Sequence, residues 1–230
     1  MIIDCISDLH GFYPELEGGD LLIVCGDLTR NNEVSEYLWF ARWLHLQDYK
    51  KKILVAGNHD ARLVEQIRWP PELLGGMCAY LMDSGTEFAG LKIWGSPWTR
   101  WFNGVNPHCA AFMLPEEGLE EKWALIPDDV DILVTHGPPL NVLDGAIDGS
   151  SCGSSSLWWR VADLKSLKFH IFGHVHEQGG KLCHPSEESG SATSINCSYV
   201  DENYEPVNKP MRLIYEHEHP AINRHDDTRF

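Results

Sequence analysis

Lys52-Ile53-Leu54-Val55-Ala56-Gly57-Asn58-His59-Asp60 combines a short apolar run with polar side chains directly behind it. A nearly continuous apolar run rich in β-branched residues is typical of a strand that is covered on both faces. Four other runs share this composition, at residues 2–7, 21–25, 130–135 and 168–172. Helical patterns separate several of these strands, and that alternation indicates an α/β layered fold.

Three segments carry apolar residues at helical spacing. The first covers residues 34–44, where Asn32 is a candidate N-cap. The second covers 116–126 behind Pro115, and the third begins after the serines at 154–156. A tight hairpin is expected around Ala89-Gly90, and later strands at 191–197 and 211–215. One domain over residues 1–215 and a polar tail at 216–230 follow from this pattern.

The composition excludes several classes of function. The chain has 230 residues and a formal net charge of −16, which disfavours both duplex nucleic acid and anionic membranes as partners. No apolar run approaches the roughly 20 residues that span a bilayer. The N-terminus does not resemble a signal peptide, and the seven cysteines are scattered without a C-x-x-C pair. A reducing compartment, the cytoplasm, is therefore expected.

Polar side chains follow each of the five predicted strands. In parallel α/β sheets, ligands bind beyond the carboxyl ends of the strands, so these groups are expected to meet at one edge. Carboxylate, amide and imidazole groups without cysteine suit Mn, Fe or Zn ions. Seven candidates are too many for one ion but serve two ions about 3.5–4 Å apart that share a bridging aspartate. They are Asp8, His10, Asp27, Asn58, His136, His174 and His176.

Two divalent ions also explain how so acidic a chain could bind a phosphate. By formal counting, two dications, two carboxylates and a bridging hydroxide leave the centre near +1. Metal binding further lowers the pKa of water to about 7, which supplies a nucleophile.

The motifs, in their order along the chain, resemble the calcineurin-like metallophosphoesterase superfamily. They are Asp8-x-His10, Gly26-Asp27, Gly57-Asn58-His59-Asp60, His136-Gly137 and Gly173-His174-x-His176. Gly95-Ser96-Pro97-Trp98 and the stretch from Asn203 to Asn208 are similar to the metallophosphoesterase-domain-containing proteins of animals, relatives of class III cyclic nucleotide phosphodiesterases. The resemblance covers residues 2–215 and implies a four-layer α/β/β/α sandwich of two mixed β-sheets with a dinuclear metal centre.

The resemblance also implies a role for each residue. Asp8, His10, Asp27 and His176 would hold the first metal, and Asn58, His136 and His174 would complete the second, with Asp27 as the bridge. His59 would be the general acid that protonates the leaving oxygen, and Asp60 would orient its ring. Arg30 would contact phosphate. Some members of the animal branch lack a histidine of the Gly-His-x-His motif, whereas this chain keeps both, which favours an active enzyme.

Two other patterns allow alternative interpretations. Gly149-Ser150-Ser151-Cys152-Gly153 fits the G-x-S-x-G elbow of serine hydrolases, but the turn-like residues before it do not form the strand that such an elbow requires. Trp94, Trp98 and Trp101 are candidates for a pocket wall beside the metals or for ordinary core packing.

The resemblance therefore implies a phosphodiesterase that acts on a small phosphate ester, with cyclic nucleotides among its substrates. A metal-bridging hydroxide would attack phosphorus, and His59 would donate the proton. A phosphomonoesterase of the same fold is the second hypothesis, and a non-catalytic metal-binding scaffold is the third. The oligomeric state stays open, with a homodimer as one option.

Overall fold

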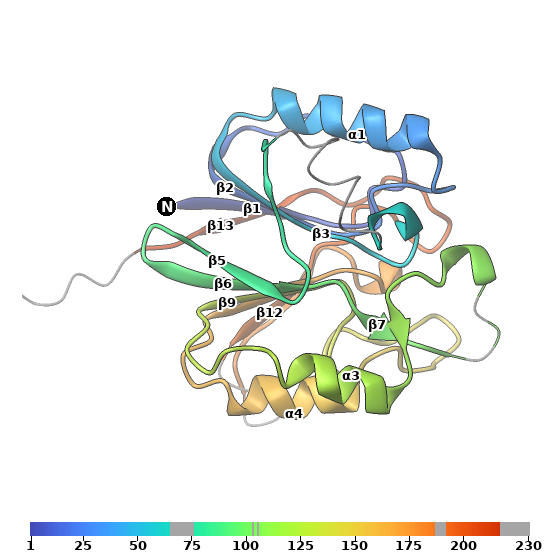
Figure 1. Ribbon diagram of the computed structural model, residues 1–230, viewed down its shortest axis with the longest axis vertical. Coiled ribbons are helices and arrows are strands. Elements are labelled where there is room, and N and C mark those ends of the chain that lie inside the picture. The colour runs from blue at the N-terminus through green and yellow to red at the C-terminus, as the bar shows by residue number, and fades with distance from the viewer. Residues whose placement is uncertain (65–75, 103, 105, 187–191, 217–230) are drawn as a thin grey trace, which may run out of the picture.

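Two β-sheets pack face to face between helices in the computed structural model (Figure 1). The structure describes residues 1–64, 76–102, 104, 106–186 and 192–216. The first sheet has the order β13-β1-β2-β3-β4 and the second the order β11-β12-β10-β9-β6-β5. The strands of the first sheet are β1 (Ile2–Ile6), β2 (Gly19–Cys25), β3 (Tyr49–Val55), β4 (Ala79–Tyr80) and β13 (Met211–Ile214).

The second sheet lies on the opposite side of the inter-sheet core. Its strands are β5 (Ser84–Phe88), β6 (Leu91–Ser96), β9 (Ile132–Thr135), β10 (Phe169–Phe172), β11 (Lys181–Cys183) and β12 (Thr193–Asn196). Two short strands, β7 (Thr99–Arg100) and β8 (Met113–Leu114), pair separately. The helix α1 (Val34–Leu46) covers the first sheet, and α3 (Glu116–Trp123) and α4 (Ser155–Asp163) cover the second (Figure 1).

Alternating side chains on the strands build three apolar layers, because successive residues of a strand point to opposite faces. Ile3 and Cys5 of β1 point into the core between the sheets. Leu22 and Val24 of β2 point the other way and pack under α1. Leu133 of β9 packs under α3 and α4 in the same manner. The predicted four-layer sandwich of mixed sheets is confirmed.

The five strands predicted from the apolar runs are all present, and within each sheet they run parallel. β1, β2 and β3 pair in parallel in the first sheet, and β9 pairs in parallel with β10 in the second. Their carboxyl ends therefore lie at one edge of each sheet, where the polar side chains follow. The hairpin of β5 and β6 is also confirmed, with antiparallel pairing around Ala89 and Gly90.

Two predicted boundaries are wrong. The N-cap of α1 is Glu33, not Asn32, because Glu33 and Glu36 satisfy each other's backbone N–H groups in a capping box. The Asn32 side chain instead accepts a hydrogen bond from the Tyr37 hydroxyl at 2.7 Å. The helix predicted over 116–126 ends at Trp123.

Some expectations fall on residues that the structure leaves undescribed. The polar tail predicted at 216–230 lies outside the described residues except for Glu216, and the strand predicted at 191–197 is described as Thr193–Asn196. In the described ranges, no helix is both long and apolar enough to cross a bilayer.

His170 is a buried titratable group outside the predicted metal centre. Its Nε2 lies 2.9 Å from the Thr135 hydroxyl, which donates its own proton to the Gly137 carbonyl oxygen at 2.7 Å. His170 Nε2 is therefore the donor of the first bond. Burial lowers the pKa of His170 to about 3, so the folded protein holds this ring in its neutral form.

This burial predicts a pH-dependent stability. Below about pH 6.5 the unfolded chain binds a proton at His170 that the folded chain does not, and this proton favours unfolding. The stability that neutral His170 contributes is therefore complete above pH 6.5 and is lost as the pH falls towards 3. His170→Gln should reduce the slope of the free energy of unfolding against pH by up to about 1.4 kcal/mol per pH unit, which is the slope for one proton. Urea unfolding at pH 7.5 and 5 tests this, with His45→Gln on the exposed face of α1 as the control. An equal slope in His170→Gln and the parent protein would contradict it.

Candidate metal centre

The loops behind the parallel strands hold the predicted ligands in unusual backbone conformations. Asp8, His10, Asp27 and His174 all lie in the left-handed region, with φ values of 53°, 42°, 52° and 69°. For residues with a Cβ this conformation costs about 1–2 kcal/mol each. Such strain gathers at functional sites, where the surrounding structure holds it in place.

The first group of ligand atoms comes from both sheets. His10 Nε2 and His176 Nε2 lie 3.3 Å apart, and His176 Nε2 lies 3.3 Å from Asp8 Oδ1. Asp8 Oδ2 accepts hydrogen bonds from the Ser198 hydroxyl at 2.7 Å and from the His174 backbone N–H at 2.9 Å. Asp8 Oδ1 is buried without a hydrogen-bond partner among the described residues. A buried carboxylate oxygen without a partner fits a cation at this position.

The second group gathers around Asn58. Its Oδ1 lies 2.9 Å from His136 Nε2 and 2.9 Å from His174 Nδ1. Its amide nitrogen donates to the Cys109 carbonyl oxygen at 2.9 Å, so the oxygen faces the two histidines. This assignment gives the oxygen the direction that a metal ligand needs.

Asp27 lies between the two groups. Its Oδ1 is 3.5 Å from His136 Nε2, and its Oδ2 is 3.7 Å from His10 Nε2. One carboxylate oxygen thus faces each group, which is the arrangement of a bridging ligand.

Backbone carbonyl oxygens fix the ring orientation of three histidines. His10, His136 and His176 place Nδ1 at 3.2, 2.8 and 3.1 Å from the carbonyl oxygens of Thr29, Cys25 and Asp201. A ring that donates from Nδ1 has its lone pair at Nε2, the atom that faces the site. The donor set, its orientation and the unpartnered Asp8 oxygen all fit two divalent ions, and the seven residues could hold them.

The charged groups of the site shift one another's pKa values. Burial opposes the ionisation of Asp8, but the charges of His176 and His136 outweigh it and hold the pKa of Asp8 well below its usual range. Against the effect of burial, Asp27 raises the pKa of His136 to about 9. Burial lowers the pKa of His10 to about 4 and that of His174 to about 3. Metal binding at His136 would therefore release a proton.

His59 lies beside the centre, with Nε2 4.0 Å from Asp27 Oδ2. The prediction that Asp60 orients the His59 ring is wrong as a direct interaction. The ring nitrogen His59 Nδ1 instead lies 3.0 Å from the Arg30 carbonyl oxygen. The buried Asp60 carboxylate instead accepts from the backbone N–H groups of Gly57, Leu28 and Thr29 at 2.9–3.2 Å. Asp60 thus ties the loop behind β3 to the loop behind β2 and positions His59 through the backbone.

The predicted phosphate contact of Arg30 finds no support in the geometry. Arg30 is exposed, and its guanidinium carbon lies 5.3 Å from the centroid of the Tyr204 ring. It is not among the side chains that line the cavity over the centre.

Two motif glycines leave room for the carboxylates. A Cβ on Gly173 would lie 2.1 Å from both Asp8 Oδ2 and the Ser7 hydroxyl oxygen. A Cβ on Gly57 would lie 2.2 Å from Asp27 Oδ1. Any larger residue must displace a predicted ligand, which explains why glycine precedes Asn58 and His174.

Sequence reasoning missed several residues around the centre. Ser198 binds Asp8, and the Tyr204 ring contacts the rings of His10 and His176 edge to face, with centroids 4.8 and 5.1 Å apart. Phe102 lines a cavity of about 290 Å³ over the centre. Strand patterns cannot reveal these residues, because all of them lie in loops; the one available signal is that Tyr204 falls in the stretch from Asn203 to Asn208, which carries the family resemblance.

The tryptophans and the serine-rich loop play structural parts. Trp94 and Trp98 pack against the core under α3, and Trp98 also contacts the Phe112 ring at 5.6 Å. The core interpretation therefore holds for both. The Ser151 hydroxyl donates to the Asp144 carboxylate, and no strand leads into this turn. The serine-hydrolase alternative thus finds no support.

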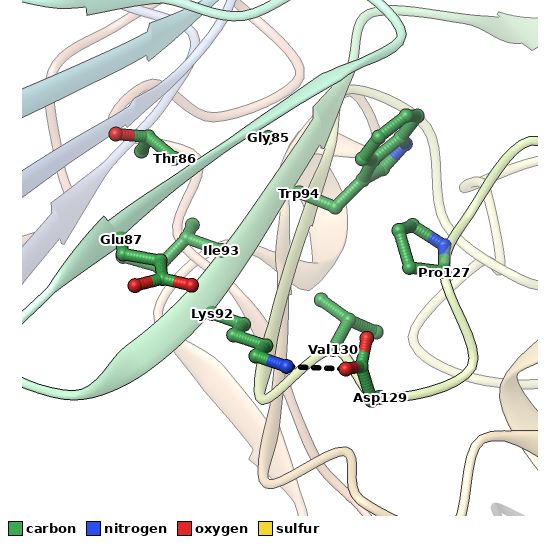
Figure 2. Close-up of a pocket in the computed structure, with 9 residues that line it drawn as sticks. All are labelled: Gly85, Thr86, Glu87, Lys92, Ile93, Trp94, Pro127, Asp129 and Val130. Atoms are coloured by element: carbon green, nitrogen blue, oxygen red, sulfur yellow. Dashed lines mark hydrogen bonds and ion pairs between the residues drawn. The ribbon is translucent and has the colours of Figure 1, made fainter.

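A second cavity, of about 270 Å³, lies on β5 and β6 (Figure 2). Trp94 forms one wall, and Lys92 is ion-paired with Asp129 at its rim. Lys92 and Val130 lie near the amino ends of their segments, away from the edge that carries the predicted ligands. None of the predicted site residues lines this cavity.

Comparison with known proteins agrees with this geometry. The family model for calcineurin-like phosphoesterases matches residues 1–178. The chain belongs to this family. Metallophosphoesterase domain-containing protein 1 of Homo sapiens is 36% identical over an alignment of 233 residues in length, which covers 90% of this chain and 68% of that protein.

A relative of lower sequence identity and a solved structure of similar fold were also found. A 3',5'-cyclic-nucleotide phosphodiesterase of Nostoc is 25% identical over 201 residues, which cover 81% of this chain and 65% of that phosphodiesterase. The crystal structure of TT1561 of Thermus thermophilus superposes with a TM-score of 0.58 and 17% identity, over 85% of this chain and 89% of that chain. This last likeness shows the shared fold.

Gly173→Ala should cost the protein bound metal. The new Cβ collides with Asp8 Oδ2, so the carboxylate must leave its place between Ser198 and the His174 N–H. We expect metal content after dialysis to fall by at least about half, with a loss of about 1–3 kcal/mol in stability from overpacking. Gly118→Ala in α3 is the control, because its Cβ would have an ordinary 3.5 Å contact. Equal metal content in both variants would argue against the predicted role of Asp8.

Proposed function

We propose that the chain is a metal-dependent hydrolase of phosphodiesters. The observation that supports this most is the position of Asp27, whose two oxygens face His136 on one side and His10 on the other at 3.5 and 3.7 Å. A carboxylate shared between two sets of nitrogen and oxygen ligands is the feature of two-metal phosphoryl-transfer sites. The family membership supports the same class of reaction.

Two bound metal ions would supply positive charge for the phosphate and lower the pKa of a water molecule. The residues of the chain hold and orient the reactants. The cavity gives the ester access to Asn58, His174 and His176, which line it. Backbone carbonyl oxygens hold the rings of His10, His136 and His176 before the substrate arrives, so that little reorganisation is needed.

His59 is proposed as the proton donor to the leaving oxygen. It lines the cavity, and its Nδ1 is held by the Arg30 carbonyl oxygen. Its Nε2 therefore points to the region between Asp27 and the cavity. Because Nδ1 donates to the Arg30 carbonyl oxygen, the ring must be in its imidazolium form to carry a second proton at Nε2, and that proton would then be within reach of an ester oxygen bound there.

Phosphodiesters are preferred over phosphomonoesters because a relative of 25% identity carries the name of a cyclic-nucleotide phosphodiesterase. Incubation with Mn²⁺ and bis(p-nitrophenyl) phosphate or p-nitrophenyl phosphate tests this choice. We expect faster release of nitrophenolate from the diester. Faster release from the monoester would support the phosphomonoesterase, and two bound metals without turnover of any ester would support the scaffold.

His59→Ala should retain its metal but lose rate. Removal of a general acid lowers the rate by about 10²- to 10⁴-fold, and the loss should be smallest for esters with good leaving groups, which need no proton. Rates for nitrophenyl and alkyl leaving groups, together with metal content, measure both effects. His45→Ala, on the exposed face of α1, should behave as the parent protein. An equal loss for good and poor leaving groups would contradict the assignment.

A further inference from the structure

The cavity over the metal centre offers few hydrogen-bond donors to the oxygens of a bound phosphate. No lysine or arginine lines it in the part of the chain that the structure describes, and Arg30 lies outside the lining. The imidazoles of the predicted ligands would face metal, and His59 is assigned to the leaving oxygen. Apart from the Asn106 amide and the Cys109 thiol, the donor that is left among the described lining residues is the hydroxyl of Tyr204.

A tight turn fixes Tyr204 beside the centre. The Asp201 carboxylate accepts hydrogen bonds from the backbone N–H groups of Asn203 and Glu205, both at 2.9 Å. The Asp201 carbonyl oxygen accepts from the Tyr204 N–H at 2.9 Å and lies 3.1 Å from His176 Nδ1. Tyr204 itself is in the left-handed region, with φ of 62°. These bonds hold a strained residue next to a predicted ligand, and such strain gathers at functional sites.

Ring contacts fix the side chain of Tyr204 as well. Its ring packs edge to face against the rings of His10 and His176, with centroids 4.8 and 5.1 Å apart. The Arg30 guanidinium carbon lies 5.3 Å from the Tyr204 centroid. Because the ring is engaged by these neighbours, the hydroxyl at its end is the part of Tyr204 that can bind a ligand.

The Tyr204 hydroxyl has no hydrogen-bond partner among the described residues. By contrast, the hydroxyls of Tyr13, Tyr37 and Tyr80 donate to protein oxygens at 3.0, 2.7 and 3.1 Å. Burial raises the pKa of the Tyr204 hydroxyl, and the nearby charge of Asp27 adds to this effect. A phenol, with an ordinary pKa of about 10, carries its proton near pH 7 and can donate it in a hydrogen bond.

We propose that Tyr204 is a catalytic residue whose hydroxyl donates a hydrogen bond to a non-bridging oxygen of the bound phosphate. The inference rests on the proposed phosphodiesterase function and adds a residue to its machinery. A donor that is fixed before the reaction stabilises negative charge on this oxygen in the transition state without reorganisation. The proton stays on Tyr204, so Tyr204 and His59 act on different oxygens of the ester.

Tyr204→Phe tests this role, because phenylalanine keeps the ring and loses only the hydroxyl. With Mn²⁺ and bis(p-nitrophenyl) phosphate, we expect kcat/KM to fall by about 10- to 100-fold, as for the loss of a hydrogen bond to a charged group. Metal content and melting temperature should match those of the parent protein. Tyr199→Phe is the matched control, because Tyr199 lies outside the cavity lining, and its kcat/KM should equal that of the parent.

The leaving group separates the role of Tyr204 from that of His59. We expect the same fold loss in Tyr204→Phe for nitrophenyl and alkyl leaving groups, because the non-bridging oxygens are common to both esters. A loss confined to alkyl esters would make Tyr204 a donor to the leaving oxygen and would overturn the assignment. Unchanged kcat/KM, or a loss of activity together with bound metal, would overturn it as well.

Binding of inorganic phosphate separates this inference from the proposed function. Titration calorimetry of the Mn²⁺-loaded proteins should show about tenfold weaker phosphate binding in Tyr204→Phe than in the parent, and Tyr199→Phe should bind as the parent does. That result would support the Tyr204 donor even if no ester were hydrolysed, an outcome that would count against the phosphodiesterase alone. Equal phosphate affinity in Tyr204→Phe and the parent would overturn the donor and leave the phosphodiesterase standing.

Discussion

The Asp8 carboxylate joins the two sheets at the edge where the site is built. It follows β1 of the first sheet, and it accepts hydrogen bonds from Ser198 and His174, which follow β12 and β10 of the second. Backbone bonds from Ser7 to Cys197 and from Tyr199 to Ser7 close the same junction. The stability of the junction and the formation of half the candidate metal centre therefore depend on the same carboxylate.

Buried charge is the second constraint. Asp8 and Asp27 are both buried, and an isolated buried carboxylate is strongly unfavourable. Histidines and backbone N–H groups compensate part of that cost, and bound cations would compensate the rest. The left-handed residues and the closely packed glycines at the strand ends add local strain. The three apolar layers must stabilise the fold enough to hold these loops in place.

The parallel strands and most of the predicted ligands could be predicted from the sequence. Apolar runs mark the strands, and the polar residues directly behind each run mark the candidate ligands. The pattern at 52–60 located both β3 and Asn58, and parallel pairing did bring such residues to one edge. Contacts within loops could not be predicted. Asp60 binds the backbone rather than His59, Glu33 replaces Asn32 as a cap, and Tyr204 covers the histidines. Each depends on which loops lie side by side, and local periodicity carries no such information.

The proposed reaction requires Asp27 to serve two cations at once. Electron paramagnetic resonance of the protein loaded with two equivalents of Mn²⁺ tests it directly, because ions that share a carboxylate a few ångströms apart couple magnetically. We expect a spin-coupled spectrum at two bound ions per chain, and Asp27→Asn should weaken or abolish the coupling. A simple six-line spectrum at full loading, or saturation at one ion per chain, would contradict it.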